Sequence, residues 1–344
     1  NGEIYNFAEL RKKFLVGVDL RSTGDTAVLG AMLERMPLEK VLQELRGMFA
    51  FVWYDSRDRK VSAARDHFGI KPMYFTEAAG SLGIASEMRS LDEATAYTFP
   101  HDPAAIRDYF RWGAVQAPRT ILQGIHSLLP GHLLTWSMGA PVEIHKWFSP
   151  QWAPETGSGT DWIQETRKAV LDSVKAHLVS DVSVGIFLSS GLDSTLIGGA
   201  IRELGGNDLT AFSIGYEDDS GVEDESRDAR RTADFLGAEF HAEVIGSRKI
   251  ADEFDNFINS LDQPTGDGLN TFLVSKMTAP HVKVALSGLG ADELFSGYTF
   301  HRALIAAEAM GLRSPLFRNF IFPLAGKVAQ QPWLAQKSVA ARRI

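Results

Sequence analysis

The chain has 344 residues, of which 44% are hydrophobic and 23% charged, so it can form about two domains with buried cores. Its net charge of −8 disfavours a nucleic-acid partner, which would need a basic surface. The sequence holds no cysteine, which excludes disulfides and thiolate metal sites and is compatible with a cytoplasmic location. It also shows no signal peptide and no apolar run of about 18 residues, so we expect no membrane partner.

The first 147 residues are dominated by strand-like alternation, and we interpret residues 1–147 as one domain. Candidate strands cover residues 48–54, 60–64, 73–76, 81–85 and 132–136, and candidate helices cover 26–34 and 38–45. Residues 148–160 are rich in Pro, Gly, Ser and Thr, which predicts a linker. A helix over 161–178, capped by Thr160 or Asp161, is predicted to open a second domain, 161–344.

In the second domain, strand and helix patterns alternate. The strands are expected at 182–188, 209–214, 239–244 and 282–286, and the helices at 194–204, 224–236, 251–261 and 271–278. Such alternation predicts an α/β fold with a doubly wound parallel sheet covered by helices on both faces.

A turn rich in small residues joins the first of these strands to its helix. It consists of Leu188, Ser189, Ser190, Gly191, Leu192, Asp193 and Ser194. Backbone N–H groups at such a turn and the helix dipole together favour an anion. Asp193 suits an anion site only if a divalent cation lies between the charges, so we interpret the loop as a site for Mg²⁺-pyrophosphate. The alternative is an ordinary helix cap, because caps use the same residue types.

A second loop of this kind follows the strand at 282–286. It reads Ser287-Gly288-Leu289-Gly290-Ala291-Asp292-Glu293-Leu294-Phe295-Ser296-Gly297-Tyr298. In a doubly wound sheet both loops would emerge at the carboxyl ends of strands, where ligands bind. Together they resemble the pyrophosphate loop and the Ser-Gly-x-Gly-x-Asp-Glu-Leu-Phe loop of the asparagine synthetase family.

The resemblance extends through nearly the whole chain. Five further segments, in order, resemble the family's glutaminase domain: 1–6, 46–51, 65–74, 85–88 and 129–132. The resemblance implies an N-terminal-nucleophile (αββα) glutaminase domain followed by an ATP-pyrophosphatase domain. It also implies that an N-terminal Cys nucleophile precedes Asn1 and that further helices follow residue 344. This chain by itself is therefore expected to lack glutaminase activity.

By this resemblance the enzyme is a glutamine-hydrolysing asparagine synthetase that uses ATP and Mg²⁺. Aspartate would be adenylated, pyrophosphate released, and the adenylate aminated by ammonia from glutamine. Asp193 and Asp292 would hold magnesium, and the ends of three strands would frame adenine and ribose through Leu188, Ile214, Gly215, Ser287 and Gly288. The expected partners are small-molecule substrates, with a homodimer as a further possibility.

The glutamine site implied by the family falls on the first residues of the chain and on Asp25. The Asn1 side chain and the Gly2 N–H would form an oxyanion hole, and Glu3 and Asp25 would hold the α-amine of glutamine. The alternative for Asp25 is a helix N-cap before Thr26.

Two residues depart from the family pattern. Ser190 replaces a glycine, and if this position needs a positive φ, its Cβ costs about 1–2 kcal/mol. Leu289 stands where an acid is usual and cannot accept a proton. Asp267 could substitute for that acid, or it could be a plain turn residue. These departures leave two alternatives open: an amidotransferase that adenylates a different carboxylate, and a degenerate nucleotide-binding protein.

Overall fold

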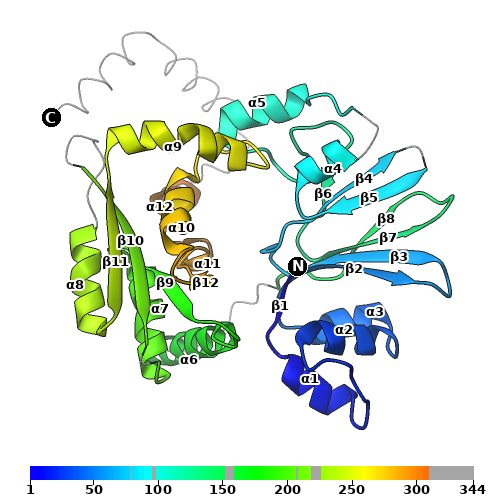
Figure 1. The fold of residues 1–344 in the computed structure, drawn as a ribbon, viewed down its shortest axis with the longest axis horizontal. Coiled ribbons are helices and arrows are strands. Elements are labelled where there is room, and N and C mark those ends of the chain that lie inside the picture. The colour runs from blue at the N-terminus through cyan, green and yellow to red at the C-terminus, as the bar shows by residue number, and fades with distance from the viewer. Residues whose placement is uncertain (79, 95–97, 152–158, 207, 218–225, 310–344) are drawn as a thin grey trace. The chain divides into compact units, whose positions relative to one another are not determined.

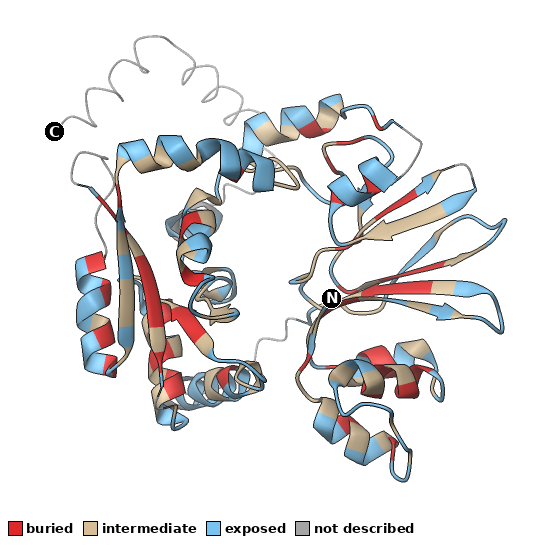
Figure 2. Ribbon diagram, viewed as in Figure 1, coloured by how far each residue is buried: buried red, intermediate tan, exposed pale blue. Residues whose placement is uncertain are grey.

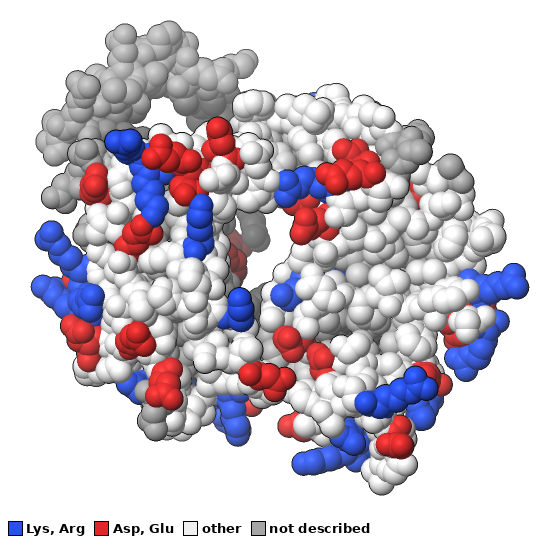
Figure 3. Space-filling view, viewed as in Figure 1, with Lys and Arg blue, Asp and Glu red and all other residues white. Residues whose placement is uncertain are grey.

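The computed structural model describes residues 1–78, 80–94, 98–151, 159–206, 208–217 and 226–309. The chain divides into two compact units, Asn1–Ser287 and Gly288–Ile344. Within the described part, no helix combines the length and hydropathy needed to cross a bilayer. On the face drawn in Figure 3, acidic and basic side chains are interspersed.

The N-terminal half of the first unit contains two antiparallel sheets (Figure 1). The larger sheet has the order β1 (Gly2–Ile4), β2 (Gly47–Asp55), β3 (Lys60–Arg65), β7 (His132–Ser137) and β8 (Glu143–Lys146). The smaller sheet has the order β5 (Ser81–Ala85), β4 (Tyr74–Ala78) and β6 (His126–Ser127). Five helices accompany them: α1 (Phe7–Phe14), α2 (Asp25–Leu33), α3 (Leu38–Glu44), α4 (Met88–Ala94) and α5 (Pro103–Trp112).

Three apolar clusters hold these layers together (Figure 2). Helices α1–α3 pack on one face of the larger sheet around Met32, Leu42 and Phe49. The other face meets the smaller sheet through residues such as Ala63 and Phe75. Helix α4 covers the far side of the smaller sheet. The layer order is therefore helix, sheet, sheet, helix, which confirms the expected αββα architecture.

The C-terminal half of the first unit is built on a parallel sheet of order β11-β10-β9-β12. Its strands are β9 (Val184–Phe187), β10 (Thr210–Tyr216), β11 (Glu239–Ile245) and β12 (Val284–Leu286). The helices are α6 (Gly159–His177), α7 (Leu192–Glu203), α8 (Ser226–Leu236), α9 (Ser247–Ser260) and α10 (Leu269–Thr278). One cluster packs α6, α7 and α8 against the sheet around Ile186, and another packs α9 and α10 around Ile245. The predicted doubly wound fold is confirmed.

Several local predictions need correction. Helix α6 begins at Gly159, ahead of both predicted cap residues, Thr160 and Asp161. The elements β1, α1, α4, α5, β6 and β8 had not been predicted; β1, β6 and β8 are only two to four residues long. Most of the predicted linker, 152–158, lies outside the described residues, so the domain boundary there stays a prediction.

Candidate functional site

The loop between β9 and α7 is fixed by its own serine hydroxyls. The Ser194 Oγ atom accepts the Ser189 N–H at 3.1 Å and lies 3.0 Å from the Ser189 Oγ. The Ser189 Oγ in turn accepts the Gly191 N–H at 3.1 Å. These bonds engage the two hydroxyls within the loop itself. The conformation of the loop is therefore held by its own hydrogen bonds, without a ligand.

Helix α7 starts immediately after Gly191, which has extended backbone angles as its N-cap. The first intrahelical bond is from the Thr195 N–H to the Gly191 carbonyl oxygen, at 3.3 Å. The amide groups of Leu192, Asp193 and Ser194 precede it and have no acceptor within the helix. They form the positive end of a twelve-residue helix, which is a suitable place for a phosphate group.

Asp193 is the second residue of α7 and is half-buried. Among the described residues, no hydrogen-bond or salt-bridge partner of its carboxylate is found, and the N-cap position belongs to Gly191. A carboxylate beside a phosphate-binding helix end is a hard oxygen donor of the kind that Mg²⁺ takes together with substrate phosphates. In the described part of the chain, no group of three or more His, Asp or Glu side chains is arranged to hold a metal ion.

The strain considered at Ser190 is not present. Only Arg59 and Ser296 among the described non-glycine residues have a positive φ. Ser190 therefore occupies an ordinary backbone conformation, and its departure from glycine carries no conformational cost.

The sheet order places three predicted segments together at the carboxyl ends of the strands. Because β9 pairs in parallel with both β10 and β12, their carboxyl ends meet at the same side of the sheet. Leu188 follows β9, Ile214 and Gly215 lie near the end of β10, and Ser287 follows β12. Strands β10 and β11 are added on one side of β9, and β12 is added on its other side. The strand order therefore reverses between β9 and β12. Such a switch point is where open α/β sheets bind their ligands.

The remainder of the second loop lies in the second unit, with Gly288. There, α11 (Ala291–Phe295) begins after Gly290 and α12 (Thr299–Ala309) follows. Asp292 is in the first turn of α11, and its Oδ1 lies so close to Gly297 that a Cβ there would come within 1.8 Å of it. The Gly297 N–H donates to the Asp292 carbonyl oxygen at 3.0 Å. Gly297 is thus needed for the loop to close on Asp292.

Two acids are candidates to replace the one missing at Leu289: Glu293, in the same loop, and Asp267. Leu289 itself is 79% exposed. Glu293 accepts the Tyr298 hydroxyl at 2.7 Å, and this bond, foremost among its causes, lowers the pKa of Glu293 and makes it a weaker base. Asp267 is engaged locally, since its Oδ1 accepts the Gly268 N–H at 2.7 Å, as in a turn.

The register of β1 explains how Gly2 could donate to an oxyanion. Asn1 and Ala50 exchange both of their N–H···O bonds, at 3.0 and 2.8 Å. Hydrogen-bonded and non-hydrogen-bonded pairs alternate in an antiparallel ladder, so Gly2, opposite Phe49, directs its N–H away from β2. Since β1 is the edge strand, that N–H points outward from the sheet.

Asp25 lies at the same edge. Its Oδ2 accepts the Ile4 N–H at 3.0 Å, and Ile4 has the same strand parity as Gly2. Its Oδ1 accepts the Thr26 N–H at 2.6 Å, although Gly24, not Asp25, is the N-cap of α2. The Thr26 hydroxyl also donates to this Oδ1, at 3.2 Å. The structure therefore places Asp25 beside β1, and its Oδ2 keeps a lone pair for a further donor.

The sequence analysis did not identify two residues that fix the backbone around β1 and β2. The Asn6 side chain donates to the Glu44 carbonyl oxygen at 2.8 Å and accepts the Arg46 N–H at 3.0 Å, which fixes the chain just after β1. Asp66 is 1% exposed and accepts four backbone N–H groups. The only signal in the sequence was that both residues belong to the glutaminase-like segments.

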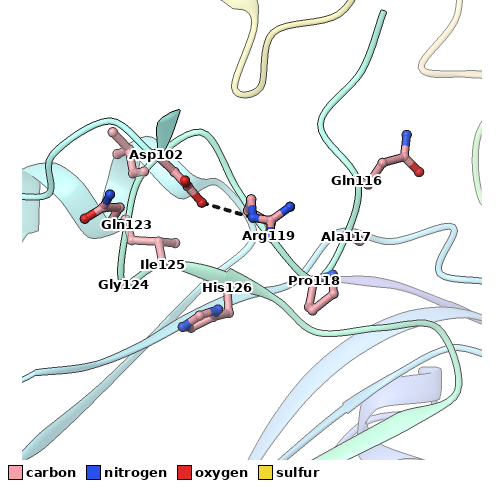
Figure 4. Close-up of a pocket in the computed structure, with 10 residues that line it drawn as sticks. Asp102, Gln116, Ala117, Pro118, Arg119, Gln123, Gly124, Ile125 and His126 are labelled. Atoms are coloured by element: carbon pink, nitrogen blue, oxygen red, sulfur yellow. Dashed lines mark ion pairs between the residues drawn. The ribbon is translucent and has the colours of Figure 1, made fainter. Parts of the chain in front are cut away.

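A pocket of about 310 Å³ lies elsewhere in this half, lined by Asp102 and by residues of the segment 116–126 (Figure 4). Its cation, Arg119, pairs with Asp102 at 3.0 Å and with Asp108 at 2.7 Å. None of the predicted site residues lines it, and its charged groups are already satisfied, so we assign it no ligand.

Two family models together match most of the chain. The family described as asparagine synthase matches residues 165–343, and the glutamine amidotransferase domain family matches residues 1–148. A glutamine-hydrolysing asparagine synthetase of Bacillus subtilis is 35% identical over 305 residues, covering 88% of this chain and 48% of the relative. A putative one of Mycobacterium bovis is 36% identical over 344 residues, covering 96% and 51%.

Other relatives carry a different name. An amidase of Penicillium rubens is 30% identical over 332 residues, covering 90% of this chain and 48% of the relative. Among solved structures, a glutamine-dependent NAD⁺ synthetase of Acinetobacter baumannii in complex with ADP has a TM-score of 0.28 and 14% identity, covering 78% of this chain and 65% of that one. The chain spans about half the length of the curated relatives named here.

Proposed function

The chain belongs to the asparagine synthetase family, and we propose that the enzyme it represents activates a carboxylate with ATP and aminates it with nitrogen from glutamine. The acceptor proposed first is aspartate, and the products are asparagine, AMP and pyrophosphate. The observation that carries the proposal is Asp193, a half-buried carboxylate in the first turn of α7 with no partner among the described residues. It stands at the edge of the parallel sheet where ligands bind.

In the first step, a carboxylate oxygen of the acceptor attacks the α-phosphorus of ATP and pyrophosphate leaves. The amide groups at the start of α7 would bind the leaving pyrophosphate, whose charge increases as the bond breaks. Asp193 would hold Mg²⁺, which neutralises phosphate charge when bound. Backbone groups near Leu188 and Ile214 would position adenine and ribose.

In the second step, ammonia attacks the acyl carbon and AMP leaves. Ammonia would come from glutamine bound along the outer edge of β1. The outward Gly2 N–H and the Asn1 side chain would stabilise the oxyanion of the tetrahedral intermediate. Asp25, anchored to the Ile4 N–H, would accept a hydrogen bond from the α-amine together with Glu3.

A second candidate function has specific support. Leu289 leaves the loop without its usual acid, and amidases occur among the relatives. An enzyme that adenylates a different carboxylate fits both observations.

The test is carboxylate-dependent exchange of labelled pyrophosphate into ATP by the full-length gene product, with a panel of amino acids and organic acids. Exchange with aspartate, followed by asparagine formation, supports the first proposal. Exchange with another acid only supports the second. The absence of exchange with every acid, while ATP still binds, would instead identify a degenerate nucleotide-binding protein.

A further inference from the structure

We propose that Asp66 is a positioning residue for the glutamine site, and that it acts through a single peptide group between itself and Gly2. The proposal rests on the function proposed above, in which the Gly2 N–H donates to the oxyanion. Asp66 is the first residue after β3, and its carboxylate hydrogen bonds reach β2 and the loop after β3. We therefore trace its effect on Gly2 through β2.

The carboxylate of Asp66 accepts hydrogen bonds from the backbone amides of two segments. Its Oδ2 accepts the N–H of Phe49 at 3.3 Å and of Lys71 at 2.9 Å, and its Oδ1 accepts the N–H of Phe68 at 3.1 Å and of Ile70 at 3.0 Å. Three of these donors belong to the loop after β3, and the fourth belongs to β2. A buried carboxylate with four N–H donors is strongly fixed.

The backbone of Asp66 forms hydrogen bonds to the same segments and to a third. Its N–H donates to the Phe49 carbonyl oxygen at 2.8 Å, and its carbonyl oxygen accepts the Gly69 and Gly131 N–H groups at 3.2 and 2.8 Å. Asp66 therefore contacts three glutaminase-like segments directly: the one on β2, its own, and the one that ends at His132.

The connection to Gly2 is the peptide group between Met48 and Phe49. Its N–H is the one that donates to Asp66. Its carbonyl points the opposite way, toward β1, because Glu3 and Met48 form the hydrogen-bonded pair that follows Asn1 and Ala50. One rigid peptide plane thus carries the Asp66 bond on one side and supports β1 on the other.

Gly2 rests directly on this peptide group. A Cβ at Gly2 would lie 2.0 Å from the Met48 carbonyl oxygen and 2.8 Å from the Phe49 Cα, and Gly2 has a φ of +123°. No atom separates the two backbones, so a rotation of the Met48–Phe49 peptide moves Gly2. The Phe49 side chain is also held, since its ring stacks on Trp147 with centroids 6.3 Å apart.

Arg65 provides a matched control on the same loop. Its guanidinium donates to the carbonyl oxygens of Lys71, Gly69 and Leu128 at 2.7, 2.7 and 2.6 Å. Arg65 thus fixes the carbonyls of the loop whose amides Asp66 fixes, and its guanidinium makes no bond to the Met48–Phe49 peptide. Arg65→Lys loosens the loop and leaves the connection to Gly2 in place.

The experiment compares Asp66→Asn with Arg65→Lys. Backbone hydrogen exchange on this chain should show the segment 1–6 exchanging about tenfold faster in Asp66→Asn. Arg65→Lys should accelerate the segments that its guanidinium contacts, 66–72 and 127–128, and leave 1–6 at the wild-type rate. In the full-length enzyme, Asp66→Asn should lower kcat for glutamine-dependent amination about tenfold and leave amination with added ammonia unchanged. Arg65→Lys should leave the ratio of the two activities at the wild-type value.

An unchanged exchange rate in segment 1–6, or an unchanged ratio of activities, would overturn the positioning role. If Asp66→Asn does not fold, Asp66→Glu, which keeps the charge and displaces it by one methylene, takes its place with the same expectations. Failure of both to fold would assign Asp66 a structural role only. A wild-type enzyme without any glutamine-dependent amination would overturn the proposed function instead, and the exchange measurement would still decide the connection between Asp66 and Gly2.

Discussion

The hydroxyl oxygen of Ser194 accepts the amide N–H of Ser189 at 3.1 Å across the mouth of the loop between β9 and α7. Ser194 is 6% exposed, so water does not replace it easily. The residue at this position therefore determines the shape of the loop before it can serve a ligand.

We predict that Ser194→Ala destabilises the protein and weakens nucleotide binding together. Removal of the hydroxyl leaves a partly buried N–H unsatisfied, which costs about 1–3 kcal/mol. Thermal unfolding and ATP titration calorimetry measure the two effects. Thr195→Ala is the control, since its hydroxyl bonds only the Gly191 carbonyl oxygen of the preceding turn. Equal losses in both variants would mean that the Ser189–Ser194 bond has no special role.

Asp193→Asn should reduce pyrophosphate formation by the full-length enzyme at least tenfold while ATP still binds. An amide is a poor ligand for Mg²⁺ compared with a carboxylate, and a tenfold loss corresponds to about 1.4 kcal/mol of transition-state stabilisation. Initial rates of pyrophosphate release provide the measurement. The matched control is Asp181→Asn, an exposed position before the other end of β9. A variant with near-wild-type rates would reduce Asp193 to a favourable charge at the helix start.

Gly2→Ala should disrupt the edge strand, because its Cβ would collide with the Met48 carbonyl oxygen. Gly17 offers a comparison, since it too has a positive φ, +74°, but nothing within 4 Å of the added Cβ. Alanine at Gly17 carries about 1–2 kcal/mol of left-handed backbone strain, whereas alanine at Gly2 carries the strain of its own positive φ together with the collision. Urea unfolding should therefore show a larger loss for Gly2→Ala. Equal losses would place the constraint in the backbone angle alone.

The sequence was informative about architecture for identifiable physical reasons. Apolar strand patterns predicted β9 and β10 because both strands have buried residues. Loop chemistry after β9 and β12 predicted where the carboxyl edge would lie. Short edge strands such as β1 and β8 carry too few residues for a periodicity to show.

The candidate site was predictable only in part. The family resemblance identified Asn1, Gly2, Glu3 and Asp25, but a local pattern cannot show that the Asp25 carboxylate reaches the Ile4 amide 21 residues away. Nor could it reveal Asp66, whose bond to Phe49 depends on the register of β2 and β3. Whether Ser190 needs a positive φ was open from the sequence for the same reason, since backbone angles depend on the whole loop; in the structure it has none.

Stability should fall between about pH 10 and pH 12. Burial, the largest cause, raises the pKa of both Tyr5 and Tyr74 to about 12 from the ordinary value of 10.0. The unfolded chain therefore ionises these phenols first, so the stability present below pH 10 is lost as the pH rises through the folded pKa. Urea unfolding at pH 9, 10 and 11 should show this slope, and Tyr74→Phe should flatten it. The exposed Tyr54→Phe variant should keep it; identical slopes in both variants would argue against the assignment.

Leu289→Glu should raise the yield of amide per pyrophosphate released in the full-length enzyme. A carboxylate at this position could accept a proton from the attacking ammonia, and such general-base help is worth about 10²–10⁴-fold. Glu293 is a weakened base through its bond to Tyr298, and Asp267 is engaged in its own turn. Leu289→Gln, which has the shape of Glu without the charge, is the control. If wild type already couples amide to pyrophosphate one-to-one with aspartate, and the Glu variant leaves that ratio unchanged, Leu289 is neutral and the acceptor is the ordinary one.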